Sequence, residues 1–76
     1  MPRELAGDVS RLTVTGDRRV HIDRHGGVTE YDEGLVAVAS GGGTIRFLGR
    51  GMSLAAMNGE ELLIEGELER IEFVRR

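Results

Sequence analysis

Several residue types are scarce or missing in this chain. Its 76 residues include no cysteine, no lysine and no tryptophan, and a single proline. Without cysteine, neither a disulfide nor a thiolate metal site can supplement the core, and a reducing compartment fits this composition. Tyr31, Phe47 and Phe73 are its aromatic residues. A domain of this size buries only about 60% of the surface that its unfolded chain exposes. Oligomerisation is therefore the remaining common source of extra stability.

Charge and hydropathy exclude further classes. The formal net charge of −3 gives no bulk attraction to nucleic acid or to an anionic membrane. No apolar run approaches the roughly 18 residues that a membrane span needs. The first residues also lack the apolar stretch of a secretory signal. We therefore expect a soluble protein on the cytoplasmic side that neither binds nucleic acid nor inserts into a membrane.

Short apolar–polar alternation is the dominant pattern of the sequence. Alternation of this kind places one set of side chains on a buried face and the other in water, which is typical of β-strands. Glycines at short intervals separate the alternating segments. The recurring apolar pairs are Leu12/Val14, Val20/Ile22, Val36/Val38, Ile45/Phe47, Met52/Leu54, Leu62/Ile64 and Ile71/Phe73.

The predicted fold is all-β. Residues 1–10 form a lead-in with room for one helical turn, and residues 11–74 form a single β domain. The short connections favour an antiparallel meander of about seven to eight short strands, folded as a sandwich or a partly open barrel. A short β-solenoid is the alternative. We expect a tight turn at Gly49-Arg50-Gly51 and a β-bulge near Glu69-Arg70, where the inward parity slips by one residue.

The same parity predicts which side chains are buried. The expected core residues include Ile45, Phe47, Leu62, Ile64 and Phe73, whereas Arg46 and Glu65 are expected to be exposed.

His21, Asp23 and His25 are the candidate metal ligands. On an extended strand they would share one face, and two imidazoles with a carboxylate could hold a metal ion. Same-face residues lie about 6.5–7 Å apart along a strand, so three ligands of one ion would need a bend. The competing interpretation is a solvated strand face, with His25 bonded to local backbone at its turn.

No catalytic motif stands out. Gly41-Gly42-Gly43 precedes a strand, whereas a phosphate-binding loop needs a helix N-terminus and usually a lysine. The paired acids Asp32/Glu33 and Glu60/Glu61 lie beside turn glycines, where solvated carboxylates are ordinary. We therefore expect no enzyme, no catalytic residue and no cofactor.

Four segments in order resemble the YabP/YqfC family of sporulation proteins, closer to YqfC. They are residues 11–16 (RLTVTG), 22–31 (IDRHGGVTEY), 43–52 (GTIRFLGRGM) and 61–73 (ELLIEGELERIEF). The resemblance implies a non-enzymatic protein of endospore-forming bacteria, made in the mother cell. It further implies a role in spore formation or spore envelope assembly. Its expected partners are other sporulation proteins, with a homo-oligomer as a further possibility.

The segment Leu35–Ser40 is the predicted contact surface, because it is apolar on both faces and carries little charge. Leu35, Ala37 and Ala39, or the opposite set Val36 and Val38, are predicted to face a partner. The alternative function is a small ligand- or metal-binding β domain that uses His21, Asp23 and His25.

Overall fold

The computed structural model describes residues 10–75, and their regular structure is entirely β-strand. All neighbouring strands are antiparallel, in the order β1-β2-β6-β5-β4-β3. The all-β prediction is confirmed, with six strands instead of seven or eight. The predicted helical turn lies outside the described residues. The strands are β1 (Arg11–Thr15), β2 (Arg19–Asp23), β3 (Val28–Asp32), β4 (Leu35–Ser40), β5 (Gly43–Met57) and β6 (Glu61–Arg75).

The strand count is lower because β5 and β6 are each 15 residues long. The tight turn predicted at Gly49-Arg50-Gly51 is wrong, since β5 runs through these residues. Their glycines bend the strand instead: the pairing with β6 shifts register here, and Gly51 has a φ of 60°. On β6, Gly66 has a φ of 149°, and a Cβ there would lie 2.8 Å from the Met52 Cα. Glycine therefore lets the two strands bend together.

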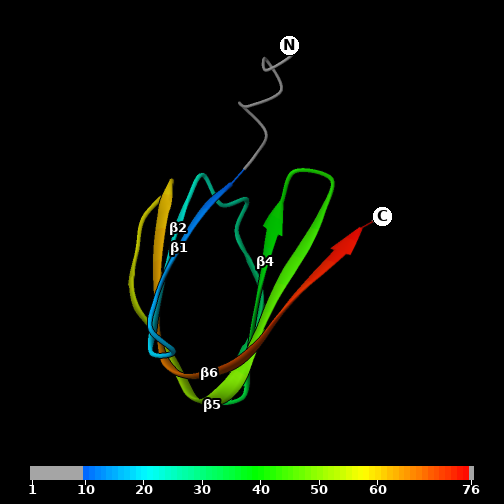
Figure 1. Ribbon diagram of the computed structural model, residues 1–76. Helices are drawn as coiled ribbons and strands as arrows, with labels where there is room; N and C mark the ends of the chain where they lie inside the picture. Colours follow the sequence, from blue (N-terminus) through cyan, green and yellow to red (C-terminus); the bar gives the residue numbers. More distant parts are fainter. Residues whose placement is uncertain (1–9, 76) are drawn as a thin grey trace.

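The bend folds the single sheet into two facing layers (Figure 1). The first layer consists of β1, β2, residues 52–57 of β5 and residues 61–65 of β6. The second layer consists of β3, β4, residues 43–50 of β5 and residues 67–75 of β6. Because every neighbouring pair is antiparallel, the chain does not form the β-solenoid that was the alternative.

The chain crosses between the layers after β2, where the predicted meander is interrupted. There, β2 pairs with β6 and not with β3. The loop at residues 24–27 reaches the second layer, where the Gly26 N–H donates to the Ala39 carbonyl at 2.7 Å. The Ala39 N–H returns a bond to the Gly27 carbonyl at 2.9 Å. These bonds place β3 beside β4.

The core lies between the layers. Val20, Ile22, Leu62, Ile64 and Met52 enter it from the first layer, and Val36, Val38, Ile45 and Phe47 from the second. The burial of Ile45, Phe47, Leu62 and Ile64 is as predicted. Arg46 and Glu65 lie on the outer faces, with side chains 38% and 40% exposed. No helix among residues 10–75 is long and apolar enough to cross a membrane.

Phe73 departs from the predicted core. It has the inward parity, because it pairs with buried Ile45, yet it is 66% exposed. Beyond the bend β6 diverges from β1, so its last residues extend past the cover that the first layer provides (Figure 1). The strand parity was therefore correct, and the burial inferred from it was wrong.

Candidate interaction surface

The three candidate metal ligands do not converge. His21 lies on β2, opposite Thr13 and Leu63, with its Nε2 3.7 Å from a carboxylate oxygen of Glu61. The strand ends at Asp23, and Arg24 has a φ of 67°, so the chain turns away before His25. No group of three or more His, Cys, Asp or Glu side chains within residues 10–75 could hold a metal ion.

His25 instead ties the 24–27 loop to the hairpin between β5 and β6. Its Nδ1 accepts a hydrogen bond from the Gly27 N–H at 3.0 Å, and its Nε2 lies 2.8 Å from the Asn58 carbonyl oxygen. An acceptor role for Nδ1 places the ring proton on Nε2, which donates to Asn58. The Arg24 N–H also donates to the Glu60 carbonyl at 2.6 Å. The local backbone bonding expected for His25 is therefore present.

Hydroxyl groups complete the connections at this end of the fold. The Ser10 hydroxyl donates to the Arg24 carbonyl at 2.8 Å, and the Ser40 hydroxyl donates to Ser10 Oγ at 2.7 Å. The loop and its contacts thus join the layers on the side of β3, while within residues 10–75 the side between β1 and the end of β6 remains open.

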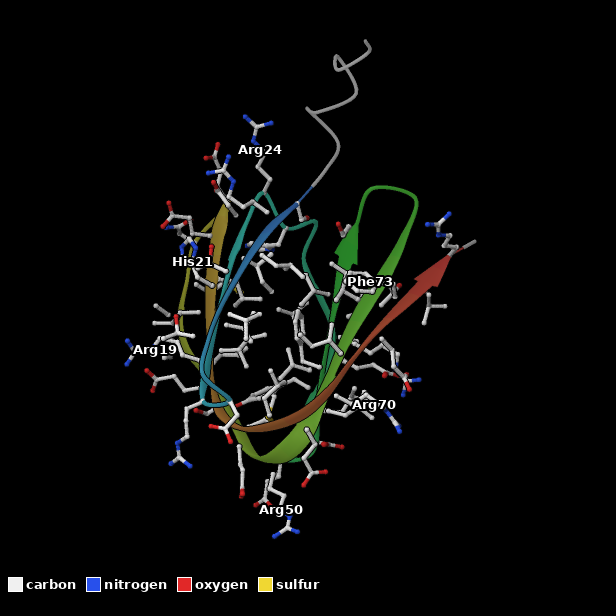
Figure 2. The ribbon with its side chains drawn as sticks, viewed as in Figure 1. Arg19, His21, Arg24, Arg50, Arg70 and Phe73 are labelled. Atoms are coloured by element: carbon white, nitrogen blue, oxygen red, sulfur yellow. The ribbon has the colours of Figure 1, made fainter. Side chains whose placement is uncertain are left out.

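A groove of about 660 Å³ occupies that open side. Leu12 lies on its β1 wall, Ile45 and Phe73 on its second-layer wall, and Ser10, Ser40 and Thr44 near its hydroxyl-lined end. Figure 2 shows Phe73 on the side of β6 that faces the first layer. Among the described residues, Phe73 is the most exposed of the large hydrophobic side chains, which makes this groove an apolar surface in contact with water.

The outer face of β6 carries charged side chains that form ion pairs with one another and with β5. Glu72 accepts from Arg46 Nη1 at 3.3 Å and from Arg70 Nε at 3.0 Å. Arg50 pairs with Glu69 at 3.3 Å. These contacts are partly exposed and contribute little to stability individually. Their effect is to balance charge along the edge of the second layer.

The bulge that the sequence predicted also lies on this edge. Arg70 pairs with Leu48 and Leu68 with Gly49, so Glu69 is the extra residue of β6. The prediction near Glu69-Arg70 is therefore confirmed. Its signal was the slip in parity between Leu68 and Ile71.

The surface nominated from the sequence lies in the middle of the second layer. Leu35, Ala37 and Ala39 point to its outer face, where Ala37 is 2% exposed between cross-strand neighbours Arg46 and Glu30. Contact between this face and a partner stays a prediction.

The opposite set of candidate contact residues on β4 lies inside the protein. Val36 and Val38 are fully buried between the layers, so they are core residues and not a contact surface.

Sequence reasoning placed Phe73 in the core and so missed its exposure at the edge of β6. The sequence offered the alternation that places Phe73 inward, but no signal of where the first layer stops. Exposure of Phe73 depends on the divergence of β1 and β6, which are separated by 45 residues in the chain (16–60).

The fold and this surface together define a small all-β protein with exposed strand edges and, among residues 10–75, no cluster of metal-ligating side chains. Residues 7–76 match the model of the YabP family, so the chain belongs to that family.

A named relative agrees with this family. The chain is 26% identical over 74 residues to the "Uncharacterized protein YqfC" of Bacillus subtilis (strain 168). The alignment covers 97% of this chain and 80% of that protein. No solved structure matches the chain. The resemblance that the four sequence segments carried is confirmed, and membership of the family indicates a role connected with sporulation.

Proposed function

We propose that this chain is a non-enzymatic sporulation protein that acts by protein–protein contact in spore formation or spore envelope assembly. Membership of the YabP family supports the connection with sporulation. The observation that carries the contact role is the open edge of β6, where a phenylalanine that faces the groove is 66% exposed. An edge strand presents unpaired backbone donors and acceptors, and proteins usually protect or use them.

The proposed location is the cytoplasm of the mother cell, and the proposed partners are other sporulation proteins. Recognition would combine main-chain hydrogen bonds along the edge with an apolar side chain in the groove, as in binding by strand addition. The charged outer face favours selective partners, because a strand with mismatched charges would be repelled.

The test is deletion of the gene in its native host, followed by counts of heat-resistant spores. We expect the count to fall and a plasmid copy of the gene to restore it. A fluorescent fusion should be visible in the mother cell during sporulation. Normal spore counts in the deletion strain, together with no expression during sporulation, would overturn the proposal.

A further inference from the structure

At the end of β6, the backbone N–H and C=O groups of three residues point away from β5, towards the free edge of the sheet. On β5, the Gly49 N–H points towards β4 and its turn, because it donates to the Gly34 carbonyl at 3.1 Å. Residues of a strand alternate between the two neighbours, so Thr44, Arg46 and Leu48 bond to β6. Their partners on β6 are Val74, Glu72 and Arg70. It follows that Ile71, Phe73 and Arg75 direct their N–H and C=O groups to the free edge.

The lower part of this edge is already occupied. The Gly66 N–H donates to the Arg18 carbonyl at 3.1 Å, and the Leu68 N–H to the Asp17 carbonyl at 2.7 Å. The turn between β1 and β2 therefore covers the edge as far as Leu68. Beyond it β1 and β6 separate (Figure 1), and within the described residues β6 pairs with β5 alone from Arg70 to Arg75.

We propose that a second copy of this chain pairs with this edge, β6 antiparallel to β6, with Phe73 opposite the second copy's Phe73. In this register Ile71 of each copy lies opposite Arg75 of the other copy. Each such pair exchanges two backbone hydrogen bonds, so about six bonds satisfy all three outward-facing positions of both copies. The inference rests on the proposed function, because it names the edge and one partner for the same contact role.

Other two-fold registers are less favourable. Centring the pair on Ile71 would place the second copy's Phe73 at the ladder position of Leu68, whose N–H is bonded to Asp17. Centring it on Glu72 would place two carboxylates directly opposite each other, which is destabilising. With Phe73 at the centre, Glu72 instead faces the second copy's Val74.

The side chains support a second copy as the occupant. The pairing brings two phenylalanines together on the inward face, where each is 66% exposed in the single chain, and aromatic cross-strand pairs are favourable. It also covers both grooves, which Leu12 and Phe73 border. Repulsion between two chains of net charge −3 is moderated at the contact, because Arg46 and Arg70 both pair with Glu72. In a two-fold symmetric contact both copies contribute this same edge, so no second binding surface is needed.

The first test measures mass in solution for three proteins. We expect the native chain to shift from monomer to dimer in sedimentation equilibrium over roughly 10 µM to 1 mM, because a contact made by three outward-facing residues of each copy falls among the small, weak interfaces. Phe73→Arg should stay monomeric, because it sets two guanidinium groups opposite each other. Val74→Arg is the matched control and should still dimerise, since that side chain would face the second copy's Glu72.

Circular dichroism and urea unfolding of each variant separate loss of pairing from loss of fold. A folded native chain that remains monomeric over the whole range overturns the proposal. Equal dimerisation of a folded Phe73→Arg also overturns it. Neither result touches the sporulation role, which the spore counts test separately.

The second test reads the register. Because the native chain has no cysteine, a single introduced thiol gives an unambiguous cross-link. Directly opposite hydrogen-bonded residues have Cα atoms about 5.5 Å apart, which a disulfide spans. Under mild oxidation Phe73→Cys should form a covalent dimer much faster than Val74→Cys, whose two copies would be offset along the strands. Equal rates, or a faster Val74→Cys, would overturn the Phe73-centred register.

Discussion

Truncating the two phenylalanines of the chain separately tests the layered fold. Phe47 is fully buried between the layers, so Phe47→Ala leaves a cavity and should cost about 3–5 kcal/mol. Phe73 has the same chemistry and the same inward parity but is 66% exposed. Only about a third of its surface is removed from water, so Phe73→Ala should cost roughly 0.5–1 kcal/mol.

The total stability of the chain sets the scale of the experiment. At about 0.05–0.15 kcal/mol per residue, 76 residues give roughly 4–11 kcal/mol. Phe47→Ala therefore removes a large share of it and can unfold the domain outright, while Phe73→Ala leaves it folded.

The assay is urea unfolding followed by circular dichroism, at a few micromolar protein, where an interface this small is dissociated. The difference in midpoint multiplied by the slope gives the difference in free energy. If both variants lose the same free energy, the end of β6 is covered in the single chain and the open groove is wrong. If Phe73→Ala loses more, the register of the second layer is wrong as well.

Four further outcomes are expected. Arg46→Ala should cost under about 0.5–1 kcal/mol in urea, because the ion pair it loses is partly exposed, and a larger loss would place Arg46 in the core. Gly49→Ala should lower the thermal midpoint strongly, since a Cβ there would collide with the Glu67 carbonyl oxygen. Gly42→Ala has open space around it and should change the midpoint little. Similar shifts for the two variants would contradict the bulge. His25→Ala should lower stability by about 1–3 kcal/mol through two lost hydrogen bonds and speed amide exchange in residues 24–27. Unchanged exchange would show that His25 does not hold this loop against the β5–β6 hairpin. If the outer face of β4 is a contact surface, Ala37→Glu should leave a folded protein that no longer binds partners. Unaltered binding would show that this face is not the contact surface. Outright unfolding would show that Ala37 belongs to the core.

The local pattern of the sequence determined a large part of the fold. Alternation sorted Val20, Ile22, Leu62 and Ile64 to one face, and the slip near Glu69 located the bulge on β6. Both follow from the two-residue period of a strand, which is a local property of the backbone. The local bonding expected for His25 rested on a similarly local argument about turns.

The long-range features were decided only by tertiary structure. Glycines at positions 49 and 51 are compatible with a tight turn or a bent strand, and the pairing of β5 with β6 selects the bend. Likewise, the pairing of β2 with β6 depends on a loop that reaches Ala39 in the other layer.

Exposure of Phe73 has the same origin. Its direction is set by strand parity, but its contact with water is set by where β1 ends its cover of β6, and no local pattern encodes the distance between two segments that far apart in the chain. The sequence alone therefore determined the all-β class, the faces of the strands and the family resemblance. The tertiary structure decided the two layers, the open groove and the free edge, because burial is a property of the whole sheet and periodicity is a property of one strand.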